Sequence, residues 1–184
     1  MLTLSEPTAF RARILEYKRR GEIIGFVPTM GFLHEGHLSL MRLARERCDH
    51  LVVSIYVNPL QFGPSEDLDR YPTDPSGDTE KCSRVGVDTL FLPPNLYDDD
   101  HSTTVAVSDL TTGLCGASRP GHFDGVTTVV ARLLGMVQPN VAVFGEKDYQ
   151  QLAVIRRMVR DLCLPVDVIG GALIRDNDGL ALSS

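Results

Sequence analysis

The sequence contains no tryptophan and only four cysteines among its 184 residues, and no two of these cysteines form a C-x-x-C pair. Their wide spacing argues against a metal site built from cysteines. A chain of this length buries roughly 70% of the surface that its unfolded form exposes, so it does not need disulfides to fold. We therefore interpret Cys48, Cys82, Cys115 and Cys163 as structural thiols.

Long apolar runs are also missing, and none approaches the roughly 20 residues that a membrane-spanning helix needs. The N-terminal residues lack the basic and apolar regions of a signal peptide, so a cytoplasmic protein is expected. The net charge of −6 and the isoelectric point near 5.3 argue against nucleic acid or a membrane as partners, because both need a basic face. A small anionic ligand held by local basic residues is compatible with this charge.

Helical and extended patterns alternate along the chain, which predicts one α/β domain built on a doubly wound parallel sheet. The periodicity predicts helices at 5–20, 36–48, 78–85, 123–137 and 149–163. It predicts strands at 23–27, 51–57, 88–92, 103–107, 141–144, 166–169 and 172–174. Residues 59–78 are rich in Pro, Gly, Asp and Ser and are expected to form a long functional loop or lid.

Three unusual loops follow predicted strands, at residues 28–37, 58–78 and 145–151. Parallel strands bring the loops at their carboxyl ends to the same edge of a sheet, and ligands bind there, where the strand order reverses. We therefore expect the three loops to meet at one active site.

The first loop carries His34 and His37, three residues apart at the start of a predicted helix. Imidazole N–H groups and the unpaired backbone N–H groups of a helix N-terminus both bind phosphate oxygens, so the pattern favours a nucleotide. Two other interpretations remain open. The pair could belong to a zinc site with Glu35, although the H-E-x-x-H pattern needs one more residue between the histidines, or the turn could be purely structural.

Amide and basic side chains near two other turns are further candidates. Asn58 and Gln61 directly follow a predicted strand and could bind the hydroxyl or carboxylate groups of a ligand. An ordinary Asn-Pro turn that leaves Gln61 in solvent is the alternative interpretation. Arg119 and His122 lie in a glycine-flanked turn before a helix, where they could bind an anion or serve only the loop.

The third loop opens the next predicted helix. Gly145 permits a ligand to approach the backbone closely, and Lys147 could supply a positive charge for phosphate. Asp148 could accept hydrogen bonds from ribose hydroxyls or simply cap the helix. Gln150 and Gln151 point about 100 degrees apart on a helix, so we expect only one of them to face the cleft. A charged helix start solvated by water is the alternative.

Five segments taken together resemble the pantoate–β-alanine ligase family, which belongs to the nucleotidyltransferase superfamily. The resemblance rests on PTMGFLHEGH (28–37), VNPLQFGPSEDLDRYP (57–72), RPGHFDGV (119–126), FGEKDYQQL (144–152) and DGLALSS (178–184). A single H-x-G-H pattern would indicate only the superfamily, whereas five ordered motifs over most of the chain indicate the family. The resemblance implies a Rossmann-like, doubly wound parallel sheet.

The resemblance also implies an activity. Members of the family join pantoate to β-alanine at the expense of ATP, with Mg²⁺, through a pantoyl adenylate, and they release AMP and pyrophosphate. They form homodimers, and their chains continue into a smaller C-terminal domain that covers the site. By this resemblance residues 1–184 correspond to the N-terminal nucleotide- and pantoate-binding domain, which we expect to keep its fold, to bind substrates weakly and to have little ligase activity.

The matched motifs carry over a set of site residues. The resemblance assigns ATP to Met30, Gly31, His34, His37, Gly145, Glu146, Lys147, Asp148, Ile174, Leu182, Ser183 and Ser184. It assigns pantoate to Asn58, Gln61, Arg119, His122 and Gln151, with Gln61 also near β-alanine and Tyr71 as a further candidate. His34, His37 and Lys147 are the expected catalytic residues, with charge stabilisation favoured over proton donation for His37. Residues 73–78 correspond to the Mg²⁺ region of the family and are less acidic here than in relatives. Within this segment Asp78 is the expected Mg²⁺ ligand.

Two rival functions remain. One is another nucleotidyltransferase of the same superfamily that releases only pyrophosphate, and the paired amides of Gln61 and Gln151 argue against it. The other is a nucleotide-binding or dimerisation module without catalysis, which the sequence leaves open.

Overall fold

The computed structural model describes residues 1–63, 66 and 68–183. Among these residues, six parallel strands form a sheet with the order β1-β4-β3-β2-β5-β6. The strands are β1 (Leu2–Leu4), β2 (Ile24–Thr29), β3 (His50–Ile55), β4 (Thr89–Phe91), β5 (Val141–Gly145) and β6 (Asp167–Gly171). The order runs one way from β2 to β4 and the other way from β5 to β6, so it reverses between the neighbours β2 and β5.

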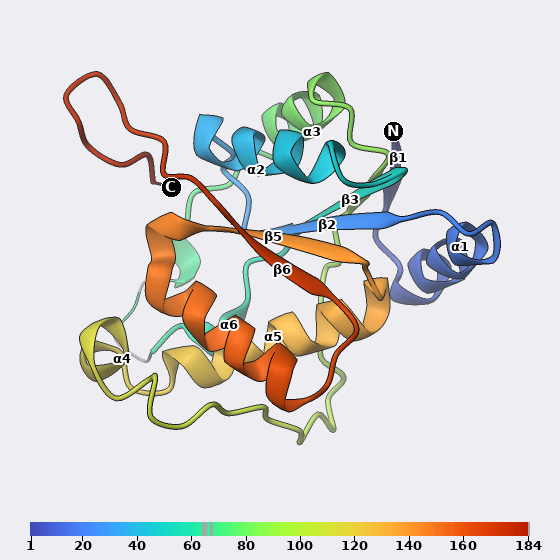
Figure 1. Ribbon diagram of the computed structural model, residues 1–184. Helices are drawn as coiled ribbons and strands as arrows, with labels where there is room; N and C mark the ends of the chain where they lie inside the picture. The colour runs from blue at the N-terminus through green and yellow to red at the C-terminus, as the bar shows by residue number, and fades with distance from the viewer. Residues whose placement is uncertain (64–65, 67, 184) are drawn as a thin grey trace.

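Helices cover both faces of this sheet (Figure 1). They are α1 (Pro7–Arg19), α2 (Glu35–Arg45), α3 (Pro75–Arg84), α4 (Leu114–Ser118), α5 (His122–Val137) and α6 (Tyr149–Asp161), with 3-10 turns η1 (Pro59–Gln61), η2 (Leu68–Arg70) and η3 (Glu146–Asp148). α2 and α3 lie on one face, α5 and α6 lie on the other, and α1 packs with α5. This arrangement confirms the predicted doubly wound sheet. None of the helices in the described part of the chain has both the length and the apolar character that crossing a membrane requires.

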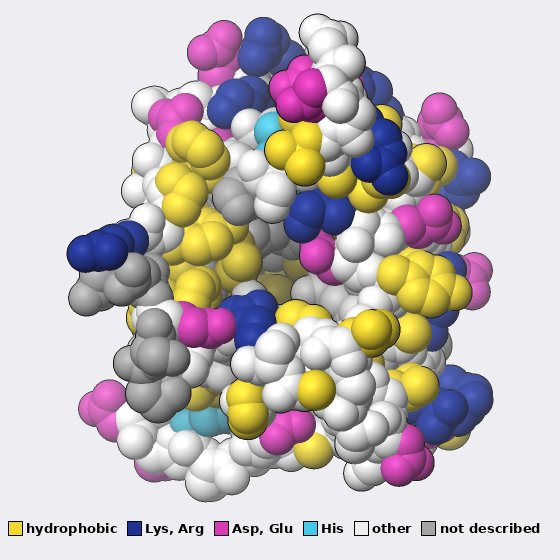
Figure 2. Space-filling model, turned by 90° about the vertical axis from the view of Figure 1, so that its left-hand side faces the viewer, with side chains coloured by type: hydrophobic (Ala, Val, Ile, Leu, Met, Phe, Trp, Pro, Cys, Tyr) yellow, Lys and Arg dark blue, Asp and Glu magenta, His cyan; other side chains and the backbone are white. Residues whose placement is uncertain are grey.

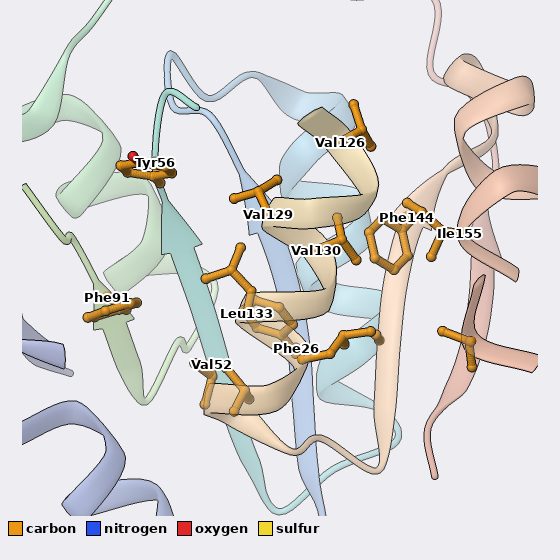
Figure 3. Packing of buried hydrophobic residues seen from close by; sticks show 14 of the residues in the cluster. Phe26, Val52, Tyr56, Phe91, Val126, Val129, Val130, Leu133, Phe144 and Ile155 are labelled. Atoms are coloured by element: carbon orange, nitrogen blue, oxygen red, sulfur yellow. The ribbon is translucent and has the colours of Figure 1, made fainter. Parts of the chain in front are cut away.

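Alternate residues of the central strands pack into two separate hydrophobic clusters. Phe26 of β2 and Val52 of β3 face α1, α5 and α6, and Figure 3 shows them near Leu133 of α5. Their neighbours Val27 and Val53 face α2 and α3. Burial on both faces explains why these strands are almost continuously apolar. Full burial of each such side chain contributes roughly 1.5–3 kcal/mol to stability.

The prediction of a strand at 103–107 is wrong. In the structure Val105 binds α5 instead: its N–H donates to Thr128 Oγ1 at 3.0 Å, and its carbonyl oxygen accepts from Thr127 Oγ1. Residues 2–4 form the strand β1, which pairs with β4 and is the outermost strand on that side of the sheet. An alternating pattern indicates a half-buried segment, and the surface of a helix can bury one side of it as well as a sheet can.

Smaller differences lie at the ends of other elements. β6 confirms the strand predicted at 166–169 and continues to Gly171, whereas the strand predicted at 172–174 is wrong. α3 begins at Pro75, earlier than predicted, because the Asp74 carboxylate accepts a hydrogen bond from the Gly77 N–H at 3.0 Å and caps the helix. The short helix α4 has no counterpart in the predicted elements.

Candidate active site

A cleft of about 400 Å³ opens at the carboxyl edge of the sheet. It lies where the strand order reverses between β2 and β5, which is where sheets of this kind bind ligands. The loops after β2, β3 and β5 all line it, so His37, Gln61 and Lys147 meet there as predicted. Figure 2 shows this side of the molecule, with a hollow that has hydrophobic side chains on its wall and basic side chains beside it.

The turn after β2 contains two consecutive residues in the left-handed region, Gly31 (φ 90°) and Phe32 (φ 50°). Backbone of this kind can direct successive N–H groups toward one point and so bind an anion. Here the anion is a side chain of the protein. The carboxylate of Asp78, in α3, accepts from the N–H groups of Phe32 at 2.8 Å and Leu33 at 2.7 Å, and it thereby holds the turn that leads into α2.

The role of Asp78 as Mg²⁺ ligand stays a prediction, and in the structure its carboxylate has other partners. Asp78 is 1% exposed, its two carboxylate oxygens accept from backbone N–H groups, and Lys81 Nζ lies 3.7 Å from one of them. It does not line the cleft. No group of three or more His, Cys, Asp or Glu side chains in the described residues is placed to hold a metal ion. The sequence could not reveal this, because the backbone partners of Asp78 lie 46 and 45 residues away along the chain.

The two histidines of the first loop cap the helix that follows them. His34 is the N-cap of α2, and its Nδ1 accepts a hydrogen bond from the Gly36 N–H at 3.1 Å. His37 Nδ1 accepts from the His34 N–H at 3.3 Å, which completes a reciprocal capping box. A Cβ at position 36 would lie 2.8 Å from His34 Cε1. Gly36 is therefore needed to let the ring of His34 lie against the backbone.

These capping bonds determine what the two rings present to the cleft. A ring nitrogen that accepts from a backbone N–H carries no proton, so the network assigns the proton of each neutral imidazole to Nε2. The ring centroids of His34 and His37 lie 4.1 Å apart. Burial lowers the pKa of His37 to about 4, with smaller contributions from His34, Lys147 and Lys81, and burial also lowers the pKa of His34. Both rings are therefore neutral N–H donors near neutral pH.

The third loop places a positive charge beside these donors. Lys147 and Asp148 of η3 both line the cleft, and Lys147 Nζ lies 3.3 Å from Asp148 Oδ1. Asp148 forms no side-chain capping bond to α6, so the alternative in which it simply caps the helix is wrong. Glu146 is not among the residues that line the cleft, and its side chain lies against Gly170 of β6, so its assignment to ATP stays a prediction.

The two glutamines at the start of α6 point in different directions, as predicted. Gln151 lines the cleft. Gln150 Nε2 instead donates to the carbonyl oxygens of Leu110 at 2.9 Å and Gly113 at 2.7 Å, and it thereby ties α6 to the segment before α4.

Gln61 is held on several sides and is only 8% exposed, so the interpretation that leaves it in solvent is wrong. Asn58 Nδ2 donates to Gln61 Oε1 at 3.2 Å, and Gln61 Nε2 lies 2.9 Å from Met30 Sδ. The main-chain oxygen of Gln61 lies 2.8 Å from His122 Nδ1. α5 packs closely on η1, where a Cβ on Gly125 would lie 2.2 Å from a carbonyl oxygen of the turn.

Arg119 and His122 line the cleft, but Arg119 already has an anionic partner. Its Nε lies 2.5 Å from Glu66 Oε1 and its Nη2 lies 2.9 Å from Glu66 Oε2. This ion pair lowers the pKa of Glu66 to about 2. Arg119 and His122 therefore hold the loop after β3 against α5.

The cleft also has an apolar wall, and the candidate residues predicted from the sequence do not include it. It consists mainly of Val126, Val129, Val130 and Leu133 of α5 with Phe144 of β5, which lie close together in Figure 3. The signal that could have predicted this wall is the composition of α5, which carries apolar residues around more than one face of the helix. Such a helix needs a second apolar partner besides the sheet, and a ligand cleft can supply it.

Most predicted residues thus share one cleft. The structure places around it Met30, His34, His37, Asn58, Gln61, Tyr71, Arg119, His122, Gly145, Lys147, Asp148, Gln151, Ile174, Leu182 and Ser183. Gly31, Asp78 and Glu146 do not line it. Ser184 lies outside the described residues. A turn brings the last segment back to the cleft, since the Leu182 N–H donates to the Ile174 carbonyl oxygen at 3.0 Å.

Comparison with known proteins gives consistent matches. The family model described as pantoate-beta-alanine ligase matches residues 2–184. The chain is 56% identical to the pantothenate synthetase of Maridesulfovibrio salexigens over 186 residues, which cover all of this chain and 66% of that protein. It is 60% identical to the pantothenate synthetase of Heliobacterium modesticaldum over 171 residues, 92% of this chain and 61% of that protein. The chain therefore spans slightly less than two thirds of the length of these relatives.

Solved structures give the same match. The crystal structure of pantothenate synthetase from Thermus thermophilus superimposes with a TM-score of 0.95 at 52% identity, covering all of this chain and 66% of that one. The pantoate-beta-alanine ligase of Francisella tularensis, complexed with beta-gamma ATP and beta-alanine, also has a TM-score of 0.95, at 37% identity, covering all of this chain and 71% of that one.

Proposed function

Because this chain belongs to the pantoate–β-alanine ligase family, we propose that its cleft activates pantoate with ATP for ligation to β-alanine. The observation that carries the proposal is the pairing of two chemistries in one cleft. His34, His37 and Lys147 offer N–H donors and positive charge, and the same cleft is lined by the apolar wall and by the amides of Gln61 and Gln151. These groups suit a triphosphate and a small branched hydroxy acid.

In the proposed first step, a pantoate carboxylate oxygen attacks the α-phosphorus of ATP. A new P–O bond forms, the bond to the bridging oxygen breaks, and pyrophosphate leaves with the electron pair, which gives pantoyl adenylate. The Nε2–H groups of His34 and His37 would donate to phosphate oxygens, and Lys147 would balance their growing charge. Because the capping bonds already orient both rings, little reorganisation is needed at the moment of reaction.

The apolar wall suits the carbon skeleton of pantoate, which carries two methyl groups on one carbon. Val129 and Val130 of α5 and Phe144 of β5 would contact these methyl groups, and the amides of Gln61 and Gln151 would bind the oxygen atoms. An amide can hold a carboxylate by hydrogen bonds without competing as a nucleophile. This wall would align the carboxylate with the phosphate for attack.

In the second step the β-alanine amine would attack the acyl carbon of the adenylate. The C–N bond of pantothenate forms, AMP leaves with the carboxyl oxygen that bridged to phosphorus, and the amine loses a proton. Gln61 is the group proposed to lie near β-alanine. Arg119 would keep the loop after β3 against α5 through Glu66 and so help to exclude water from the adenylate.

The described residues hold no group of three or more His, Cys, Asp or Glu side chains for a metal ion, and the Asp78 carboxylate binds backbone N–H groups. We therefore propose that Mg²⁺ enters as part of the substrate, bound by the phosphate oxygens of ATP.

Isotope exchange between pyrophosphate and ATP tests this proposal. We expect exchange that requires pantoate, because only an adenylate formed from pantoate returns the label to ATP. Exchange without pantoate would indicate another nucleotidyltransferase, and ATP binding with no exchange would indicate a non-catalytic module. Either result contradicts the proposed function.

We also propose that the chain forms a homodimer in the cytoplasm, where its substrates would be available. Leu114 and Tyr149 are 83% and 70% exposed and offer apolar surface to a second copy. Sedimentation equilibrium would give twice the 20.2 kDa mass of the chain if this is correct.

A further inference from the structure

Tyr97 lies outside the cleft but is hydrogen-bonded to a residue that lines it. The Tyr97 O–H donates to Asn58 Oδ1 at 2.9 Å. Its main-chain N–H donates to Asn95 Oδ1 at 3.1 Å, and its ring lies 5.7 Å from the Arg132 guanidinium. Tyr97 is not among the residues around the cleft, so it would not touch a ligand there.

The contacts of Asn58 give its amide a single orientation. Asn58 is fully buried. Its Oδ1 accepts from the Tyr97 O–H at 2.9 Å and from the Leu60 N–H at 3.4 Å, while its Nδ2 donates to the Gly125 carbonyl oxygen at 3.0 Å and to Gln61 Oε1 at 3.2 Å. A flipped amide would lose its bonds to the Leu60 N–H, the Gly125 carbonyl oxygen and Gln61 Oε1, so these three contacts set its orientation, while the Tyr97 hydroxyl anchors the amide in place. Tyr97 supplies the shorter of the two bonds to Oδ1.

The orientation of Asn58 determines that of Gln61 in turn. Because Asn58 donates to Gln61 Oε1, this oxygen already has a partner, and the N–H side of the amide turns toward Met30 and the cleft. Gln61 Nε2 lies 2.9 Å from Met30 Sδ, which is a weak acceptor. The amide therefore presents N–H donors, and a second hydrogen is available to a ligand.

We propose that Tyr97 is a positioning residue that acts through Asn58 to hold the N–H side of the Gln61 amide toward the cleft, so that the site selects a ligand group with an acceptor oxygen. The inference rests on the proposed function in one respect, since it takes pantoate as the ligand that Gln61 contacts. A Gln61 amide free to flip would present its carbonyl oxygen for part of the time and would repel a carboxylate.

The test compares two conservative variants, Tyr97→Phe and Tyr17→Phe. The first keeps the ring and removes only the hydroxyl that binds Asn58. The second removes the hydroxyl of a buried tyrosine that lies 3.3 Å from Thr89 Oγ1, at the start of β4 and at the opposite edge of the sheet. Both variants lose one tyrosine hydrogen bond, so the pair separates a local loss of stability from an effect on Gln61.

Calorimetric titration of each protein with pantoate and, separately, with ATP measures the effect. We expect Tyr97→Phe to raise the Kd for pantoate about fivefold, as the loss of one hydrogen bond predicts, and to leave the Kd for ATP unchanged. We expect Tyr17→Phe to change neither. An unchanged Kd for pantoate in Tyr97→Phe, or equal losses for pantoate and ATP, would overturn the inference.

A second measurement does not depend on pantoate. In the ligand-free protein we expect the side-chain amide signals of Gln61 in ¹⁵N–¹H spectra to shift in Tyr97→Phe and to stay unchanged in Tyr17→Phe. If the wild-type chain binds no pantoate, the proposed function fails and these signals alone decide whether Tyr97 orients Gln61. Gln61 signals that do not move would refute the inference by themselves.

Discussion

Polar side chains have different roles at the amino ends of the strands, which we call the amino edge, and at their carboxyl ends, the carboxyl edge. At the amino edge, polar side chains bind the backbone of neighbouring strands: Asn140 Oδ1 accepts from the Ile24 N–H at 2.9 Å, and Asp88 Oδ2 accepts from the Leu51 N–H at 2.8 Å. Asp88 also pairs with Arg45 of α2. These side chains therefore have hydrogen-bond or ion-pair partners within the protein.

At the carboxyl edge, several donors lack such partners. His34 and His37 use Nδ1 to cap α2, and in the described part of the chain neither Nε2 has a hydrogen-bond partner. Lys147 pairs with its exposed neighbour Asp148. A polar residue therefore marks the site when some of its hydrogen-bonding capacity remains for a ligand. Asp78 shows the converse, because its carboxylate already binds the turn after β2.

Removing a charge from each edge should give the largest contrast. We expect Lys147→Ala to lower the rate of pantoate-dependent exchange by about 10²–10³, because it removes a preorganised charge that we propose to lie beside the reacting phosphate. Lys18→Ala is the matched control, since Lys18 Nζ binds the Gln138 carbonyl oxygen at the other edge. Similar exchange rates in the two variants would contradict the proposed difference between the two edges.

A second contrast concerns pH. The pKa of His37 is about 4 in the folded state against an ordinary value of 6.5, so between these values the unfolded chain binds more protons than the folded one. The free energy of unfolding therefore falls as the pH falls through this window. The contribution of His37 should amount to about 2 kcal/mol between about pH 7 and pH 5. Urea unfolding of wild type and His37→Gln at both pH values measures it, and parallel losses in the two proteins would contradict the prediction.

At the amino edge, a substitution should lower the free energy of unfolding and leave ligand binding unchanged. Asp88→Ala leaves the Leu51 N–H and the Arg45 guanidinium without this partner, and we expect a loss of about 1–2 kcal/mol in the free energy of unfolding. The affinity for ATP should stay unchanged, because Asp88 does not line the cleft. Weaker ATP binding by a variant that remains folded would show that the two edges are coupled.

The smallest effect is expected at the apolar wall. Val130→Ala removes two methyl groups that we propose to contact pantoate, and the Kd for pantoate should rise about fivefold with no change for ATP. Titration calorimetry with both ligands measures this. An equal change for both ligands would show that the variant disturbs the whole cleft.

Much of the fold follows from local patterns. The strands at β2, β3 and β5 and the helices α2, α5 and α6 have periodic apolar residues along a continuous stretch, and such stretches specify their own secondary structure. Segment 103–107 has the same kind of pattern and is not a strand, because Thr127 and Thr128 of α5 bind its backbone. A pattern indicates which side is buried but does not identify the partner that buries it.

The doubly wound order of strands and helices can be predicted from the amino-acid sequence, and with it the meeting of three loops at one edge where His37, Gln61 and Lys147 share a cleft. These features depend on residues close together along the chain and on the rule that parallel strands align their ends. Only the tertiary structure decided that Asp78 binds backbone and that Tyr97 reaches Asn58. The reason is physical: whether a donor or acceptor remains available depends on partners 39 or more residues away, and those partners meet only when the core has packed.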